Sequence, residues 1–170
     1  GTLDKNYSLD FTKLFPSSSV SYKLKKDFSL SLALSKRLER TTTFKMNPFP
    51  EREHSETLEQ GDPNLNPEFI DQVEFGINKK TKKGNTRFFK VYYRSVKDLI
   101  NRVNTVYNDT ILNRIYSNVG NAKVIGRENG GEYSFGKKLK IFYSTSFYYY
   151  VIKGSFDDDI INTDDYVYSL

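Results

Sequence analysis

The chain has 170 residues, a formal net charge of +5, 13 tyrosines, 13 phenylalanines, no cysteine and a mean hydropathy of −0.63. The lack of cysteine excludes disulfides and thiolate metal sites, and the many aromatic residues argue against disorder. The longest apolar run, Phe147 to Ile152, is far shorter than the roughly 20 residues of a membrane-spanning helix. A transmembrane β-barrel escapes that test, because only alternate residues of its strands contact lipid.

Two-residue alternation of apolar and polar side chains is the main pattern in the chain, and it predicts β-strands. It is clearest from Phe28 to Arg37, where large apolar residues alternate with small polar ones. The predicted antiparallel strands lie, in chain order, near residues 14–24, 28–38, 68–79, 86–97, 121–135 and 138–153. Strands of about ten residues are longer than the usual ~5–6 of globular proteins and match the ~9–11 of membrane barrels.

The connections between these strands alternate in length. The short turns are 25–27, 79–85 and 136–138, and the long loops are 39–67, 97–120 and 154–170. Up-and-down strands would place all short turns at one end and all long loops at the other, as in outer-membrane barrels. The lysines gather at the short turns instead of spreading along one face, so we expect no nucleic-acid partner.

These patterns predict an all-β fold, an antiparallel up-and-down transmembrane β-barrel segment with about six strands of a larger barrel. Residues 1–170 would form one partial barrel domain whose polar parity faces a wet lumen. The residues expected to face membrane lipid are Leu30, Leu32, Leu34, Phe89, Val91, Ile141 and Phe147. Tyr148-Tyr149-Tyr150 is expected to lie in the aromatic girdle at the lipid–water boundary.

About six strands are fewer than the eight of the smallest outer-membrane barrels. Both ends of such a sheet would leave unpaired backbone groups in lipid, where nothing satisfies them. The chain also begins at Gly1 with polar sequence, without an initiating methionine or a signal peptide. We therefore expect a fragment that further strands, of the parent chain or of partner chains, must close.

Several motifs resemble one family in the same order. Leu14-Phe15-Pro16-Ser17 followed by 20–24 resembles the "LFPSxxLSYKL" strand of the outer-membrane β-barrel family of TonB-dependent receptors, and 29–37 resembles its "SLSLSYSRR" strand. Asn47-Pro48-Phe49 with 61–68 (GDPNLNPE) is similar to its "NPF…GNPNLKPE" loop. Val91-Tyr92-Tyr93-Arg94 and Gly126-Arg127-Glu128 match its "LYYR" and "GxE" marks. The departures are Thr41-Thr42-Thr43 and the irregular strand 121–135.

The resemblance implies a receptor of the bacterial outer membrane that imports a scarce ligand. It implies a plug domain, energy supplied through TonB by way of a plug segment that this chain lacks, and a barrel of about twenty-two strands. The partners implied are outer-membrane lipid, the remaining strands and the plug, and TonB; a surface lipoprotein is a further candidate. The alternatives left open are a soluble β-sandwich or adhesin-like binding module and an outer-membrane structural or assembly barrel without transport.

The candidate ligand-facing residues lie in the first long loop: Asn47, Phe49, Arg52, His54, Asp62 and Asn64. Asp157, Asp158 and Asp159 could offer carboxylate oxygens to Ca²⁺, although a solvated acidic loop is the simpler interpretation. Asp62 and Asn64 resemble the start of a calcium loop whose later positions are absent, so turn chemistry is favoured there. No nucleophile–base pair or phosphate loop is present in the sequence, and we expect no enzyme activity, no cofactor and no resident metal.

Overall fold

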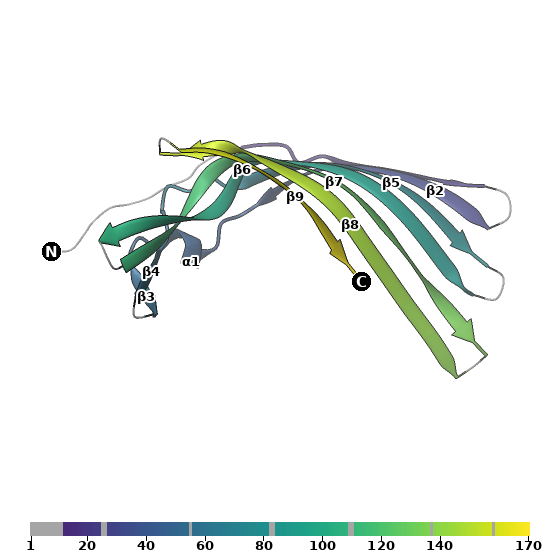
Figure 1. Ribbon diagram of the computed structural model, residues 1–170. Helices are drawn as coiled ribbons and strands as arrows, with labels where there is room; N and C mark the ends of the chain where they lie inside the picture. Colours follow the sequence, from purple (N-terminus) through teal and green to yellow (C-terminus); the bar gives the residue numbers. More distant parts are fainter. Residues whose placement is uncertain are drawn as a thin grey trace.

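The computed structural model describes residues 12–24, 27–54, 56–81, 84–108, 111–136, 138–157 and 159–170. These residues form a nine-stranded sheet and one short helix (Figure 1). The elements are β1 (Ser17–Lys23), β2 (Phe28–Glu39), α1 (Thr43–Met46), β3 (Glu51–His54), β4 (Thr57–Gln60), β5 (Glu68–Lys80), β6 (Thr86–Asn108), β7 (Ile111–Phe135), β8 (Leu139–Phe156) and β9 (Asp159–Ser169). No helix of the described residues is long and apolar enough to cross a membrane.

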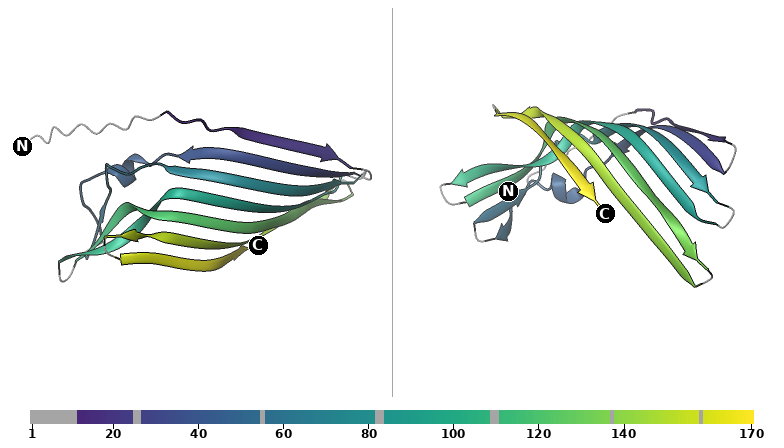
Figure 2. Two further views of the ribbon diagram at one scale, coloured as in Figure 1. Left: turned by 90° about the horizontal axis from the view of Figure 1, so that it is seen from above. Right: turned by 45° about the vertical axis from the view of Figure 1, so that its right-hand side comes forward.

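The long strands follow one another as antiparallel neighbours. The order is β1-β2-β5-β6-β7, and β8 and β9 continue the sheet beyond β7. This confirms the antiparallel up-and-down arrangement. The sheet forms a curved single layer that does not close (Figures 1 and 2). Within the described residues, β1 pairs with β2 alone and β9 pairs with β8 alone, so the chain forms part of a barrel wall.

The turns β1–β2, β5–β6 and β7–β8 lie together at one end of the sheet, which we call the short-turn end (Figure 1). Asp27 (φ 65°) and Gly136 (φ 65°) adopt the left-handed conformation that such tight turns need. Residues 25, 26, 82, 83 and 137, which were included in the three predicted turns, lie outside the described residues. The opposite end is called the long-loop end.

The segments predicted to be long loops contain regular structure. Strand β6 runs on to Asn108 and β7 begins at Ile111, so 97–120 is mostly a hairpin instead of a loop. A bulge between Val96 and Leu99 shifts the register there. The two-residue alternation of apolar and polar side chains changes phase at the bulge, so the pattern in the sequence indicates a strand only as far as Lys97. The acidic segment 154–170 pairs with β8 as β9. The third segment, 39–67, contains α1, β3 and β4.

The two faces of the sheet differ in polarity and in burial. In one line of paired residues, Leu32, Phe75 and Val91 lie side by side, and Leu32 keeps 45% of its surface exposed. On the opposite face Val96 and Ala122 are buried in a small cluster with Ile70, as expected where side chains crowd together on the concave side of a curved sheet. The apolar face is therefore the convex one.

The residues predicted to face lipid lie on this convex face. Leu32, Leu34, Phe89, Val91, Ile141 and Phe147 are exposed and Leu30 is partly exposed. No described element covers them, which is contrary to a soluble sandwich that buries one parity. The tyrosine run divides between the faces: Tyr149 shares the line of Tyr93 and Ile125, whereas Tyr148 and Tyr150 lie on the concave face.

Candidate functional site on the concave face

The concave face carries two adjacent groups of interacting polar side chains in the middle of the sheet. Lys90 Nζ lies 3.3 Å from a carboxylate oxygen of Glu74. Gln72 Oε1 accepts hydrogen bonds from Arg94 Nε at 3.1 Å and from Arg37 Nη2 at 2.9 Å. These side chains come from alternate positions of β2, β5 and β6, which point to the same face of the sheet. The register of the three strands brings them next to one another.

Aromatic rings lie beside this polar group. Gly126 of β7 separates Tyr92 from Tyr148 in one line of paired residues. A Cβ at Gly126 would lie 2.5 Å from Tyr92 Cζ and 2.8 Å from Tyr148 Cβ, so the glycine is needed for the Tyr92 ring to lie against β7. Arg94 lies 5.7 Å from the Tyr92 ring. The result is a surface of hydroxyls, amides and charges that suits a solvated passage.

Residues 40–67, which we call the loop module, lie on the concave side at the long-loop end (Figures 1 and 2). Strand β4 pairs in parallel with the first residues of β7, from Thr57 opposite Leu112 to Gln60 opposite Ile115. The amide of Leu112 also donates to the carbonyl of Glu56 at 2.9 Å. The module is thus an extension of the barrel wall.

The edge of β7 changes partner where the module begins. From Gly120 onward it pairs with β8, and between 112 and 115 it pairs with β4. A Cβ on Gly120, whose φ is 133°, would lie 2.3 Å from the carbonyl oxygen of Lys153 and 2.5 Å from the Cα of Gly154. Two glycines facing each other therefore let the strands approach closely just where they separate.

Polar side chains hold the module against the β6–β7 extension. Asn118 Oδ1 accepts from the amide of Asn66 at 2.8 Å, and its Nδ2 donates to the carbonyls of Asn66 at 3.0 Å and Asp98 at 2.7 Å. Leu65, which precedes Asn66 in the GDPNLNPE motif (61–68), keeps only 3% of its surface exposed. These contacts explain why the motif is followed directly by β5: it is the point where the module rejoins the wall.

A carboxylate anchors the hairpin β3–β4. Glu59 Oε1 accepts from the hydroxyl of Tyr116 at 2.8 Å and lies 3.4 Å from Arg102 Nη1. The Tyr116 ring in turn meets Phe44 edge-on at 6.1 Å, and Lys45 Nζ lies 5.7 Å from its centroid. Helix α1, β4, β6 and β7 therefore converge on one tyrosine.

Half of the predicted ligand-facing residues are engaged in turn structure. Asn47 Oδ1 accepts from the amide of Phe49 at 3.1 Å, and its Nδ2 donates to Glu51 at 2.8 Å. Asp62 Oδ1 accepts from the amide of Asn64 at 2.8 Å. This is the Asx-turn chemistry favoured by the sequence for Asp62 and Asn64.

The other three residues present their side chains to solvent. Phe49 keeps 63% of its surface exposed, and Arg52 and His54 are exposed on β3. The enclosed space between Phe49 and the rest of the module is only about 10 Å³, room for about one water molecule. Among the described residues, this space is too small to hold more than a water molecule.

The acidic residues near the end of the chain lie at a tight connection between β8 and β9. Asp157 has a φ of 53°, Asp159 begins β9 opposite Phe156, and Asp158 lies outside the described residues. In the part of the chain that the structure describes, no three carboxylate or histidine side chains gather in a group that could hold a metal ion.

Sequence reasoning did not single out the concave set of Gln72, Glu74, Lys90 and Arg94, nor the anchors Glu59 and Asn118. All four residues of the first set belong to the polar parity that the sequence predicts to face the lumen, although none was named there as a site residue. The anchors carry no such signal, since Glu59 and Tyr116 are far apart in sequence and meet only through the β4–β7 pairing.

Comparisons with known proteins identify the family of this chain and a receptor of similar structure. The model of the outer membrane protein beta-barrel family matches residues 1–170. The siderophore receptor PirA from Pseudomonas aeruginosa is similar in structure, with a TM-score of 0.62 and 16% sequence identity over 91% of this chain and 33% of that receptor chain. The chain thus spans about a third of the receptor that it matches. No curated protein matches it. The chain belongs to the outer membrane protein beta-barrel family, and it is a protein of the bacterial outer membrane.

Proposed function

We propose that this chain is part of the barrel of a TonB-dependent receptor that binds a ligand at the cell surface and takes it up. The observation that carries the proposal is the loop module, which is fastened to the wall on the concave side at the long-loop end. In outer-membrane barrels the longer loops face the outside medium and the short turns face the periplasm. A ligand arriving from outside would meet the module first.

The concave face supports uptake instead of adhesion alone. Toward the short-turn end from the module, it presents the pairs Gln72–Arg94 and Glu74–Lys90 and the rings of Tyr92 and Tyr148. Such a surface can exchange hydrogen bonds with a polar solute or with a polar plug domain. We propose a plug and TonB as partners, with a surface lipoprotein as a further candidate, and we propose no catalytic step.

The exposed residues Phe49, Arg52 and His54 would contact the ligand. They offer an aromatic ring, a permanent cation and an imidazole at exposed positions of the segment 49–54. Aromatic and arginine side chains dominate many binding surfaces because they combine a large contact area with directed polar groups. Asn47, Asp62 and Asn64 would act by holding the module in shape.

The test is the triple variant Phe49→Ala, Arg52→Ala, His54→Ala of the intact protein. Deleting 52–60 is less informative, because it removes the ladder between β4 and β7. A matched control removes an aromatic residue and two lysines at the short-turn end: Phe142→Ala, Lys80→Ala, Lys138→Ala. Binding and cellular uptake would be measured with a panel of radiolabelled ferric siderophores, the class named for the similar receptor.

We expect the module triple to lose about tenfold or more in affinity, corresponding to about 1.4 kcal/mol, and the control to keep its affinity. Heat-modifiable migration in gels would verify that both barrels are folded. Equal binding by all three proteins would remove this surface from the site. Failure of the wild-type protein to bind or import any ligand while forming a stable barrel would favour a structural barrel over a receptor.

A further inference from the structure

A row of lysines crosses the convex face at the long-loop end. Lys36 of β2 and Lys123 of β7 lie in one line of paired residues, linked through Asp71 and Ser95. In the adjacent line toward the long-loop end, Lys97 of β6 pairs with Phe69, and Lys153 of β8 pairs with Asn121. All four lysines are exposed, and we call them the lysine row.

The apolar belt ends just below this row. The line two residues nearer the short-turn end contains Leu34, Val73, Tyr93, Ile125 and Tyr149, which are joined in register from β2 to β8. Thus the convex face changes within two residues from aliphatic and aromatic to mostly charged and polar, with Lys36, Asp71, Ser95, Lys123, Val151 and Asp164 in the next line. In a barrel this step marks the boundary between the hydrocarbon layer and the headgroups.

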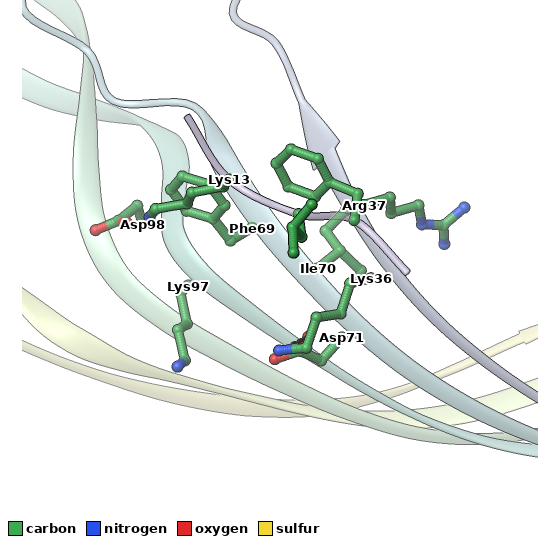
Figure 3. A pocket seen from close by; sticks show the side chains of 10 residues that line it. Lys13, Lys36, Arg37, Phe69, Ile70, Asp71, Lys97 and Asp98 are labelled. Atoms are coloured by element: carbon green, nitrogen blue, oxygen red, sulfur yellow. Dashed lines mark ion pairs between the residues drawn. The ribbon is translucent and has the colours of Figure 1, made fainter. Parts of the chain in front are cut away.

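A cavity of about 210 Å³ lies at one end of the row, lined by Lys13, Phe15, Lys36, Phe69 and Lys97 among others (Figure 3). The rings of Phe15 and Phe69 stack at 6.5 Å, and Lys13 Nζ lies 3.7 Å from the Phe69 centroid. The lining also includes Arg37 and the carboxylates Asp71 and Asp98, so cations outnumber carboxylates by four to two. Aromatic walls with an excess of cations suit a molecule with an anionic head and an apolar tail.

Charge on this band is poorly balanced by the protein itself. Asp71 pairs with Lys36 at 2.9 Å. Asp164 lies in the same line of paired residues as Lys123, and Asp98 lines the cavity, so three carboxylates face the four lysines of the row and Lys13. Within the described residues, no ion pair involves Lys97, Lys123 or Lys153. Lysines at a membrane boundary extend their ammonium groups toward the headgroups while their stems cover apolar surface, so an external anion would complete this band.

We propose that the lysine row binds the phosphate-bearing headgroup of an anionic lipid in the outer leaflet, with the acyl chains on the apolar belt below it. The occupant is a lipid because the row borders the lipid-facing belt directly and lies on the face opposite to the candidate ligand site. Lys97, Lys123 and Lys153 lie on three neighbouring strands, β6, β7 and β8, whose spacing of about 4.8 Å suits a headgroup with more than one anionic oxygen. The inference stands whether or not the protein transports a ligand.

The experiment uses the intact protein reconstituted into vesicles of phosphatidylcholine that contain a minor fraction of phosphatidic acid, followed by native mass spectrometry of retained lipid. The test variant is Lys97→Gln, Lys123→Gln, Lys153→Gln. The control removes three lysines at the short-turn end, Lys23→Gln, Lys80→Gln, Lys138→Gln, and so changes the net charge equally. A second variant replaces the same three row lysines by arginine, which keeps the charge and preserves folding if glutamine does not.

We expect the glutamine triple in the row to retain phosphatidic acid about tenfold less well or worse, because each lysine near a charged membrane surface contributes substantially. The short-turn control and the arginine triple should retain it as the wild type does. Equal retention by both glutamine triples would overturn the proposal, since bulk charge would then account for binding. Displacement of the lipid by equimolar inorganic phosphate would also overturn it, because the apolar belt would then contribute nothing.

Discussion

The wall of the barrel and the loop module belong to one sheet, yet different interactions hold them together. In the wall, β2 and β5 pair along continuous ladders with the parts of β6, β7 and β8 that lie toward the short-turn end. Their side chains alternate between a lipid-facing and a polar face. In the module, short elements are positioned by a few side chains such as Asn118 and Glu59. The wall should therefore be sensitive to the face on which a substitution falls, and the module to the loss of individual polar groups.

The largest expected effect tests the faces of the wall. Leu32→Arg places a charge on the convex apolar face and should cost about 2–4 kcal/mol in a bilayer if it lies near the midplane. The neighbouring substitution Ala33→Arg falls on the concave face, opposite Glu74, and should cost less than about 1 kcal/mol. Urea titration of both variants folded into vesicles measures the difference. Equal costs would contradict the assignment of the faces.

The second largest loss of stability is expected for a substitution at the junction between wall and module. Gly120→Ala introduces a Cβ against the backbone of Lys153 and Gly154 at a φ of 133°, so the expected cost is about 1–3 kcal/mol. Gly84→Ala has a φ of 86° and nothing within 4 Å of the added atom, and it should show only the backbone strain, about 1 kcal/mol. The free energy of unfolding of the two variants separates crowding from strain. A Gly120 variant as stable as the Gly84 variant would mean that the strands can separate without loss.

A smaller effect should be confined to the module. Asn118→Ala removes three hydrogen bonds, two to Asn66 and one to Asp98, at an expected cost of about 1–2 kcal/mol. Amide hydrogen exchange should accelerate over residues 61–67 and stay unchanged in β2 and β5. Asn104→Ala, at an exposed position of β6, is the control. Faster exchange throughout the wall would show that module and wall unfold together.

The smallest effect concerns the ion pair of Arg102 with Glu59, at 3.4 Å and with 42% of the arginine side chain exposed. Arg102→Ala should cost about 0–1 kcal/mol, and less at high salt, because exposed pairs are screened. Tyr116→Phe removes the 2.8 Å hydrogen bond to the same carboxylate and should cost about 1 kcal/mol regardless of salt. Denaturation at low and high salt distinguishes the two contributions. A larger, salt-sensitive loss for Arg102→Ala would assign the anchor to charge instead of hydrogen bonding.

Much of the wall could be predicted from the order of residues alone. Strands 28–38 and 68–79 agree with β2 and β5 to within one residue, because unbroken alternation covers each of them. The prediction failed in 97–120 and 154–170, where a bulge at Asp98 and a run of aspartates hide strands that exist by pairing with β7 and β8. The ligand role of Phe49, Arg52 and His54 and the calcium role of the acidic residues remain predictions.

Parity along each strand is a local property, and it was enough to indicate the up-and-down sheet, its apolar outer face and its membrane setting. The placement of the module was not accessible in the same way. It depends on a parallel pairing between β4 and β7, on two glycines that meet at Gly120 and Gly154, and on Asn118 binding a segment 52 positions earlier in the chain. The lysine row likewise arises only when the register brings five strands, β2, β5, β6, β7 and β8, side by side. Contacts between distant segments are selected by register and crowding in three dimensions, and no periodicity along a single segment encodes them.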